Sequence, residues 1–494
     1  MPSPERPSRV HPLVHPLDAY LTHGPAPTHD EGVVVNTHSP TSTSTPDPAP
    51  ASGPAPAHVP APQPTLQGPL TRRHLLGLGA ATATTLGLAA CGVSPQQTGQ
   101  GSPEGTIRFA WWGNDSRQKI FTEFAGGFDG GTVKVEPSEY SGYGDRLSVQ
   151  AAGKNLPDVL WMPANLALTY ATRGALYDLG TLPEGTIDYS AFDPQVVESW
   201  KLGGKQYGPV YSQYSTCTQV DTTAMAAVGI QDLPDDESWT WDDLSTLAAD
   251  YARAKGEGNW GIANQSTFYQ HAHLWIRQQG AEVFTPDGKI GFDVDVLGSW
   301  FAWWQKATDA GGVMPTQISA GKTQWTQTGG KTALYLVQLN QFQDNASFSG
   351  ENELQLVKSP VAAGAAPDYQ FKYYTRLCSG ANTTSPELAG QFINFSLNDP
   401  SNADVVGLAS GIPSNPEIVA AIKAAADPTA MKILEMTDRI DEQPMRARPE
   451  PPVGGANWQT LVEKAGDDIF NGGVAIDAAV QEGIATLQAA LDKG

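Results

Sequence analysis

The fold is decided by a stretch near the start of the globular part of the chain, residues 106–136, which reads TIRFAWWGNDSRQKIFTEFAGGFDGGTVKVE. Alternating apolar side chains predict a strand over 106–111. Asp115, in the turn that follows, is a natural N-cap, and apolar residues then recur at helical spacing. The alternation returns over 132–136 and predicts a second strand.

The pattern continues with a helix over 146–152 and a third strand over 158–162. The order strand, helix, strand, helix, strand predicts a parallel sheet with helices on its faces, so the fold class is α/β. In such sheets, ligands bind beyond the carboxyl ends of the strands. Trp111, Trp112 and Trp161 end two of these strands, so aromatic side chains are expected where a ligand would lie.

The second half of the chain adds further elements. A Thr-x-x-Asp capping signal begins a helix at Thr240, which Gly256 ends. Residues 285–289 are typical of a turn between short strands. Helices are also predicted over 295–310 and 474–491.

The composition is uneven along the 494 residues. Residues 1–70 contain 17 of the 39 prolines and six of the nine histidines, and their only aromatic residue is Tyr20. Such a segment cannot bury enough apolar surface to offset its ordering entropy, so we expect a disordered leader. The whole chain has 30 Lys and Arg against 52 Asp and Glu, a net charge of −22, which argues against a nucleic-acid partner.

Residues 71–90 have the parts of an export signal. The pair Arg72 and Arg73 precedes an uncharged run that is short for a transmembrane helix. The pair resembles a twin-arginine (Tat) signal, and the LAAC sequence ending at Cys91 resembles a bacterial lipobox. In that motif the cysteine becomes the lipidated first residue of the mature chain. We therefore expect a lipid anchor at Cys91 and a flexible tether over 91–104.

A signal that begins at residue 71 stands unusually late in the chain. Either residues 1–70 form a cytoplasmic leader, or translation starts downstream at a residue such as Val33, Val59 or Leu70. A downstream start would use a non-Met codon, because the next methionine is Met162.

Signals for catalysis and metal binding are poor. The sequence has no G-x-S-x-G, Walker, G-x-G-x-x-G or H-E-x-x-H motif. The pair His271 and His273 lacks a nearby Cys or Glu cluster that would complete a metal site. A glycosidase needs two carboxylates at a fixed separation, which a sequence does not show. We therefore expect no catalytic residue, no metal and no cofactor.

The 13 tryptophans, all after residue 110, are the informative feature. Trp300, Phe301 and Trp304 share a helical face and are expected in the core, while Trp303 points away from it toward the surface or an interface. Loop tryptophans flanked by Asn, Gln and Gly suit the apolar face of a sugar ring. Ligand contact and core packing are equally expected for five of them: Trp111, Trp112, Trp161, Trp325 and Trp458.

Six segments, in order, resemble bacterial extracellular solute-binding proteins of ABC importers, in the maltose-binding-like, sugar-directed branch (solute-binding family 1). The resemblance covers roughly residues 105–494. The segments are LPDVLWM at 156–162, GALYDL at 174–179, GKQYGP at 204–209, GI through WTWDDL at 229–244, KTAL at 331–334 and ELAGQFI at 387–393.

The resemblance implies a two-lobed, periplasmic-binding-protein-like fold of type II, with the ligand in a cleft between lobes joined by crossing strands. Lobe 1 is expected over 105–211 and lobe 2 over 212–360. Residues 361–494 are expected to return to lobe 1, with the C-terminal helices in or beside it. Cys217 and Cys378 would then lie near the lobe junction, where a disulfide is conceivable, but we favour two buried thiols that do not pair.

The ligand contacts that the resemblance implies come from strand ends, from the first crossing, from the second lobe and from the C-terminal loop. They are Trp111, Trp112, Asp115, Tyr143, Trp161, Asn165, Gln213, Tyr214, Trp325, Gln338, Asn340 and Trp458. Two places depart from the family pattern. Val220-Asp221 replaces the usual Tyr-Asn, and residues 336–340 lack the usual Gly and Trp, so the sequence does not name the sugar.

The sequence therefore predicts a monomeric carbohydrate-binding lipoprotein that is exported, anchored on the outer face of the cytoplasmic membrane, and delivers a small-molecule carbohydrate to ABC permease subunits without covalent chemistry. One alternative is the same scaffold with a non-sugar solute, such as a polyol phosphate or a peptide. For an anionic ligand the candidate partners are Arg376, Arg446 and Arg448. Another alternative is a secreted glycoside-processing enzyme.

Overall fold

The computed structural model describes residues 104–233, 238–319 and 325–494. The chain divides into two units, Met1–Cys91 and Gly92–Gly494, and all the described residues belong to the second. The predicted leader, the signal over 71–90, Cys91 and nearly all of the tether lie outside the described residues.

Among the described residues, six strands form the first sheet, in the order β11-β4-β10-β3-β1-β2. β1 pairs in parallel with β2 and β3, which confirms the predicted parallel start, while β10 runs antiparallel to β3 and β4. The strands are β1 (Thr106–Trp112), β2 (Thr132–Ser138), β3 (Val159–Pro163), β4 (Val210–Tyr214), β10 (Tyr373–Cys378) and β11 (Ile412–Pro413).

Helices cover both faces of this sheet because β1 presents apolar side chains to both. Phe109 packs in one cluster with Phe121 and Phe392, and Ala110 packs in another with Leu147. The helices of this region are α1 (Asp115–Gly126), α2 (Tyr143–Ala152), α3 (Ala164–Thr172), α4 (Pro194–Ser199) and α11 (Pro386–Asn398). The alternation in the sequence therefore fixes which helix lies on which face.

The ends of α1 and α2 differ from the prediction. The N-cap of α1 is Asn114, whose side chain accepts a hydrogen bond from the backbone N–H of Arg117, and Asp115 is the first helical residue. α2 begins at Tyr143, three residues before the predicted start. Gly142, with φ of 79°, makes the left-handed turn that starts it.

The second sheet contains five strands within the described part of the chain, in the order β7-β6-β8-β5-β9. β6 is parallel to β7 and β8, and β5 is antiparallel to β8 and β9. The strands are β5 (Thr216–Asp221), β6 (Trp260–Ala263), β7 (Val313–Met314), β8 (Thr332–Gln338) and β9 (Leu354–Lys358).

Several helices pack around the second sheet, and the predicted capping signal is confirmed in one of them. Thr240 and Asp243 form a reciprocal capping box at the start of α6, which ends at Gly256. The helices are α5 (Thr222–Ala226), α6 (Trp241–Lys255), α7 (Tyr269–Gln278), α8 (Val294–Asp309), α9 (Thr316–Ser319) and α10 (Phe342–Phe348).

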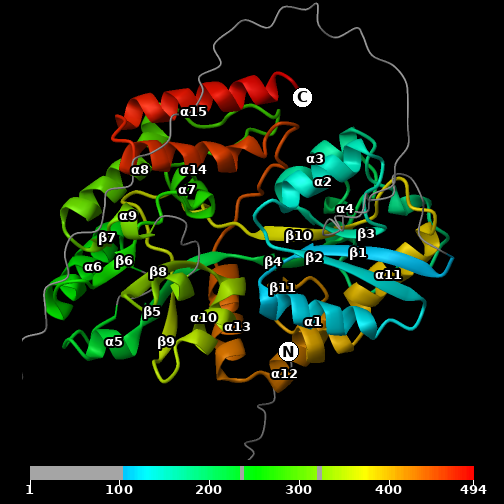
Figure 1. The fold of residues 1–494 in the computed structure, drawn as a ribbon, viewed down its shortest axis with the longest axis horizontal. Helices are drawn as coiled ribbons and strands as arrows, with labels where there is room; N and C mark the ends of the chain where they lie inside the picture. Colours follow the sequence, from blue (N-terminus) through cyan, green and yellow to red (C-terminus); the bar gives the residue numbers. More distant parts are fainter. Residues whose placement is uncertain (1–103, 234–237, 320–324) are drawn as a thin grey trace, which may run out of the picture. The chain divides into compact units, whose positions relative to one another are not determined.

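The chain passes between the two sheets at three places (Figure 1). β4 of the first sheet continues into β5 of the second with only the buried Ser215 between them. The chain returns from β9 to β10 through residues 359–372, and it leaves again after β11. The molecule therefore has two α/β lobes joined by crossing segments, as the sequence predicts.

Three of the four C-terminal helices, α13, α14 and α15, pack against the second lobe, while α12 contacts β11 of the first sheet. α14 contacts α7, and α15 packs on α8 and α14, while α13 lies on β9 and α10. This differs from the expectation that the C-terminal helices lie in or beside lobe 1, and the reason is their apolar faces, which join the core of the second sheet. The helices are α12 (Pro416–Ala425), α13 (Pro428–Asp441), α14 (Asn457–Phe470) and α15 (Ile476–Leu491).

A cluster of tryptophans lies in the core of the second lobe; we call it the tryptophan cluster. Trp300 and Trp304 are 0% exposed, as predicted. Trp303 is buried as well and donates a hydrogen bond to the backbone of Trp241, so it lies in the core of the lobe and the expectation of a surface or interface position is wrong. Its ring meets the rings of α6 and α7, and these helices cover the side of α8 that was expected to face solvent. The cluster consists of Trp241, Trp275, Trp300, Trp303 and Trp304.

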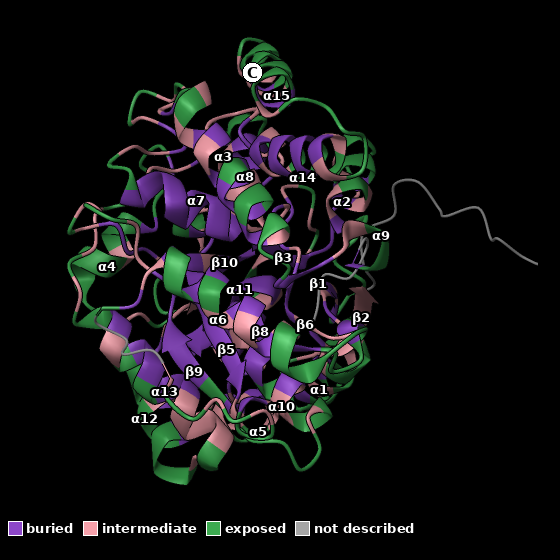
Figure 2. Cartoon of the chain, turned by 90° about the vertical axis from the view of Figure 1, so that its left-hand side faces the viewer, coloured by how far each residue is buried: buried purple, intermediate pink, exposed green. Residues whose placement is uncertain are grey.

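Burial is deepest in α7 and in the central strands of the two sheets, whereas the edge strand β2 has no buried residue (Figure 2). No helix within the described ranges is both long and apolar enough to cross a membrane.

Candidate functional site

A line of aromatic side chains runs across the junction of the two lobes; we call it the aromatic chain. It begins at the carboxyl end of β1 in the first lobe, passes to the N-terminus of α7 in the second, and ends on the two strands beside the crossing. Its members are Trp112, Tyr140, Tyr269, Tyr373 and Tyr214.

Each member of the aromatic chain contacts the next. The rings of Trp112 and Tyr140 meet edge to face, with centroids 5.9 Å apart. The hydroxyl of Tyr140 interacts with the hydroxyl of Tyr269. The ring of Tyr269 meets the edge of Tyr373 at 6.0 Å, and Tyr373 stacks on Tyr214 at 5.7 Å with 19° between the ring planes. The aromatic chain thus connects both lobes and the crossing strands.

Most of these rings are neither core nor free surface. Tyr140 is 43% exposed, while burial of its hydroxyl among protein atoms raises its pKa. Trp112, Tyr214 and Tyr269 are partly exposed, and burial raises the pKa of both tyrosines. Partly exposed aromatic faces at the junction of two lobes are suited to stacking on a flat ligand.

Polar side chains bridge the lobes beside the aromatic chain. Asn114 of the first lobe donates a hydrogen bond to Asp344 of the second (Nδ2 to Oδ2, 2.8 Å). Arg117 donates to the backbone oxygens of Ala409 at 2.8 Å and of Asn340 at 3.4 Å. The hydroxyl of Tyr140 donates to Oε1 of Gln459 at 3.2 Å. These contacts hold the two walls of the cleft together.

The hinge side of the cleft carries a group of charges on β10 and the C-terminal loop. Arg376 is 1% exposed and donates to Glu450 Oε1 (Nη2 to Oε1, 2.8 Å), and the hydroxyl of Tyr374 donates to the same oxygen. The guanidinium of Arg448 lies over the rings of Tyr373 and Tyr374, at 5.1 and 4.9 Å from their centroids. Both rings therefore make cation–π contacts with it.

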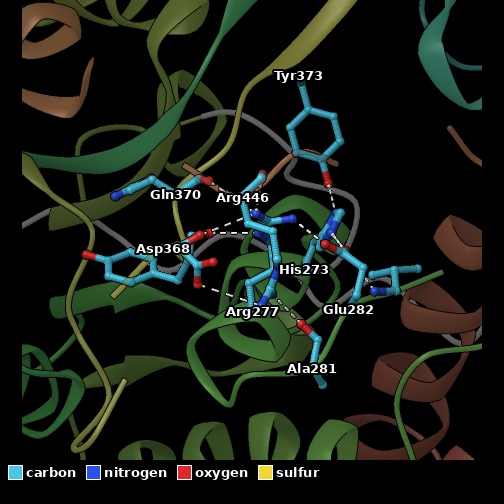
Figure 3. A network of polar contacts seen from close by, with 10 residues as sticks. His273, Arg277, Ala281, Glu282, Asp368, Gln370, Tyr373 and Arg446 are labelled. Atoms are coloured by element: carbon cyan, nitrogen blue, oxygen red, sulfur yellow. Dashed lines mark hydrogen bonds and ion pairs between the residues drawn. The ribbon is translucent and has the colours of Figure 1, made fainter. Parts of the chain in front are cut away.

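Behind the aromatic chain, a buried polar network ties α7 to the return crossing (Figure 3). His273 lies between Tyr373 and Glu282, with its Nδ1 at 3.0 Å from the tyrosine oxygen and its Nε2 at 2.5 Å from the carboxylate. Arg277 pairs with Glu282 and donates to the backbone oxygens of Tyr369 and Gln370. The network fixes the position of Tyr373.

The protonation states in this network follow from burial. Burial lowers the pKa of His273 to about 4, so its imidazole is neutral at pH 7. Burial alone would raise the pKa of Glu282, but its hydrogen bond with His273 and the charge of Arg277 bring it down to about 2. The carboxylate is therefore ionised and accepts hydrogen bonds from both neighbours.

Several predicted ligand contacts lie at this junction. Trp112 and Tyr214 belong to the aromatic chain, and Gln213 precedes Tyr214 in β4. Gln338 ends β8, and Asn340 follows it with a buried side-chain oxygen that has no hydrogen-bond partner among the described residues. The exposed Asp115 and the half-buried Asn165 lie in the first turns of α1 and α3.

The other predicted contacts are buried in hydrophobic clusters. Trp111 and Trp161 pack with Phe121 in the first lobe, and Tyr143 is buried below Trp112. Trp325 and Trp458 are 2% and 5% exposed in cores of the second lobe. Their contact with a ligand stays a prediction.

Sequence reasoning missed Tyr140, Tyr269 and Tyr373, while their neighbour Arg448 was named only as a candidate partner for an anionic ligand. Tyr140 stands in a Ser- and Gly-rich loop after the second predicted strand, so the rule that singled out the loop tryptophans would have found it if applied to tyrosine. Tyr269 and Tyr373 reach the cleft through tertiary packing, for which the sequence has no local signal.

The two histidines and two cysteines among the described residues are buried in the fold. His271 and His273 lie on α7, not on a strand, and both are buried. No group of three or more His, Cys, Asp or Glu side chains among the described residues is arranged to hold a metal ion. Cys217 and Cys378 are separate buried thiols in strands of different sheets, and burial raises the pKa of Cys378 to about 12.

A second, open groove runs along α15 and is lined from both lobes. Its lining includes Arg173, Asn457, Glu482 and Lys493 and contains no aromatic side chain. The aromatic chain therefore makes the cleft the better candidate for a ligand with flat apolar faces.

Comparison with known proteins points to one family. The model of the bacterial extracellular solute-binding protein family matches residues 119–432. Among solved structures, a periplasmic oligogalacturonide-binding protein from Yersinia enterocolitica, in complex with saturated digalacturonic acid, is 19% identical with a TM-score of 0.69; the match covers 78% of this chain and 99% of that one.

Two further structures share the fold. The GacH receptor of Streptomyces glaucescens, described unliganded and with acarbose, is 16% identical with a TM-score of 0.65, over 79% of this chain and 99% of that one. A substrate-binding protein of Listeria monocytogenes in complex with cycloalternan is 18% identical with a TM-score of 0.62, over 78% and 98%. The fold is therefore the two-lobed periplasmic-binding-protein type II, as the resemblance in the sequence implies.

Proposed function

Because the chain belongs to the bacterial extracellular solute-binding protein family, we propose that it binds a carbohydrate outside the cell and delivers it to an ABC importer. Membership of this family implies an exported protein that binds small solutes and works by binding rather than catalysis.

The aromatic chain is the observation that carries the proposal. A pyranose has an apolar C–H face that stacks on an aromatic ring and a rim of hydroxyls that needs polar partners. Trp112, Tyr140 and Tyr214 present partly exposed rings from the first lobe and the crossing. Asn114, Gln338 and Asn340 bring amide groups to the same junction. The side-chain oxygen of Asn340 has no hydrogen-bond partner among the described residues. Aromatic faces for stacking, with polar groups at the same junction, match the apolar face and the hydroxyl rim of a sugar.

The ligands of the structural neighbours agree with this choice. The proteins named above are described with saturated digalacturonic acid, acarbose and cycloalternan. All three ligands are oligosaccharides or their analogues, so we propose a sugar as the ligand of this protein too. The contacts we propose for it are the sequence-predicted residues that lie at the junction, together with Tyr140, Tyr269 and Tyr373.

Loading then shifts an equilibrium between open and closed arrangements of the lobes. The bridges from Asn114 to Asp344 and from Tyr140 to Gln459 join the two walls, so they form only when the lobes are close. A ligand that stacks on the aromatic chain adds contacts to both lobes and favours the closed form. The closed form is the one we expect the permease subunits to recognise.

We further propose that the protein acts as a monomer anchored by lipid at Cys91 on the outer face of the cytoplasmic membrane, after export by a twin-arginine signal. It requires no cofactor or metal in this role. Cys91→Ala should release the protein from the membrane fraction or block its processing. An unmodified residue other than Cys91 at the mature N-terminus, measured by mass spectrometry, would contradict the anchor.

The sugar is tested with a panel of mono- and oligosaccharides, with thermal shift and calorimetry as readouts. We expect at least one sugar to raise the melting temperature and to bind without turnover. Stabilisation by polyol phosphates or peptides, with none by sugars, would favour the same scaffold with another solute. Hydrolysis of a glycoside in the same samples would favour an enzyme.

A further inference from the structure

We propose that Arg448 forms an anion-binding subsite in the cleft, beside Tyr373 and Tyr374, and that this subsite holds the carboxylate of an acidic sugar. This inference rests on the proposed function, since it names the substrate class of the same cleft.

The first observation is that two donors of Arg448 are unused. Its Nε and Nη2 atoms are buried and have no hydrogen-bond partner among the described residues, although the guanidinium does interact with the hydroxyl of Tyr374. Burying charged donors without acceptors is costly, so such groups in a native protein are paired or have a ligand. Arg448 is thus incomplete without an acceptor.

The second observation is the balance of charge around it. Among the described residues around β10, the return crossing and the C-terminal loop, four arginines face three carboxylates. Glu450 pairs with Arg376, and its charge also acts on Arg448. Glu282 pairs with Arg277, and Arg446 lies 3.7 Å from Asp368. One positive charge remains, although the whole chain carries −22. The charges involved are those of Arg277, Arg376, Arg446 and Arg448 and of Glu282, Asp368 and Glu450.

The geometry of the unused donors favours a carboxylate. The Nε–H and Nη2–H bonds of a guanidinium point the same way, and their spacing matches the two oxygens of a carboxylate. A single excess positive charge also balances one carboxylate better than a phosphate, which carries about −1.5 to −2 at pH 7. A uronic acid combines this group with a pyranose ring.

The position of Arg448 suits a ligand on the aromatic chain. Its guanidinium lies over Tyr373, which stacks on Tyr214. Burial raises the pKa of the Tyr214 hydroxyl, and the charge of Arg448 is near enough to oppose part of that rise. A sugar ring stacked at Tyr214 would therefore carry its substituents toward Arg448.

The first test needs no knowledge of the sugar. Arg448→Met removes a buried guanidinium of which two donors have no acceptor among the described residues, so we expect the melting temperature of the unliganded protein to rise. The matched control is Arg376→Met, which breaks a paired and hydrogen-bonded guanidinium and should lower the melting temperature or prevent folding. If Arg448→Met lowers the melting temperature as Arg376→Met does, Arg448 is structural and the proposal fails.

The second test compares digalacturonate with the matching neutral galactose disaccharide, by calorimetry. The wild type should bind the acid about tenfold to a hundredfold more tightly, and Arg448→Gln should abolish this difference while its affinity for the neutral sugar is kept. Arg446→Gln should keep the preference for the acid. Equal losses for both sugars in Arg448→Gln, or no preference in the wild type, would overturn the subsite.

The two proposals fail in distinguishable ways. A protein that binds neutral sugars of the panel without any gain for their acidic counterparts contradicts only the anionic subsite. A protein that binds no sugar at all contradicts the proposed function as well.

Discussion

Two groups of aromatic side chains in this molecule have opposite surroundings. The tryptophan cluster lies in the core of the second lobe, where Trp300 and Trp304 are completely buried. The aromatic chain lies between the lobes, and Tyr140 is 43% exposed. The first group stabilises one lobe, while the second connects two lobes that must separate.

The difference shows why the chain uses tyrosine at the junction. A tyrosine offers a flat apolar face and a hydroxyl that finds a partner in a wet cleft. Tyr140 uses its hydroxyl toward Gln459 and Tyr269, both on helices associated with the second lobe. In the core, the tryptophan N–H groups that are paired find acceptors within their own lobe, such as the backbone oxygen of Ser266 for Trp300.

The largest expected effect comes from the tryptophan cluster. Trp300→Ala removes a fully buried ring and should lower the free energy of unfolding by about 3–5 kcal/mol. Chemical denaturation measures the loss, and calorimetry with the identified sugar should show unchanged affinity at a temperature where the variant is folded. A strong loss of affinity with normal stability would remove the distinction between the two groups.

Trp458→Ala tests which group Trp458 belongs to. Its ring is 5% exposed and meets Phe292 at 5.3 Å, so we expect a loss of about 3 kcal/mol in unfolding free energy. The prediction from the sequence gives the other result, weaker sugar binding with an unchanged melting temperature. Parallel thermal melts and binding curves separate the two.

The hinge end of the aromatic chain should make the stability depend on pH. His273 has a pKa of about 4 in the folded state, below its ordinary value of 6.5, so the unfolded chain binds more protons between these values. The contribution of His273 to the free energy of unfolding is therefore complete above pH 6.5 and is lost as the pH falls toward 4. At pH 5 the loss from this group is about 2 kcal/mol. Glu282, with a pKa of about 2, contributes its loss only at lower pH.

The comparison variant for this prediction is His273→Gln. We expect its unfolding free energy to fall less between pH 7 and pH 5 than that of the wild type. An identical slope in both proteins would show that another group, such as the buried His271, carries the dependence.

Tyr214→Ala should act on binding rather than on stability. The ring is partly exposed and stacks on Tyr373, so its loss removes a sugar platform and should weaken affinity by about 1–3 kcal/mol. A melting temperature that drops as far as that of Trp300→Ala, with affinity intact, would place Tyr214 with the core residues.

The smallest effect is expected from Tyr140→Phe. The ring stays and only the hydroxyl that reaches Gln459 and Tyr269 is lost. The closed form should therefore be destabilised relative to the open form by about 0.5–1.5 kcal/mol. Affinity measured by calorimetry should fall by that amount while the melting temperature without ligand barely changes. A matched control is Tyr177→Phe in the first lobe, which should leave the affinity unchanged.

The sequence predicts what depends on short-range pattern. The alternation in residues 106–111 fixes β1, and the Thr240 capping signal fixes the start of α6. Trp303 was misplaced because one helix cannot show that α6 and α7 cover its second face. Likewise, the choice between core and cleft for Trp161 depends on Phe121 and Tyr211, which lie far from it in the chain.

The placement of Trp112 has a spectroscopic consequence. All tryptophans except Trp112 and Trp260 are buried, so their fluorescence emission is set by surroundings that a ligand does not reach directly. Trp112 stands at the junction of the lobes, with the ring of Tyr140 on one side and that of Trp161 at 5.1 Å on another. A ligand that displaces water from this ring should shift its emission, and Trp112→Phe should silence the signal. The protein therefore carries its own optical reporter of cleft occupancy.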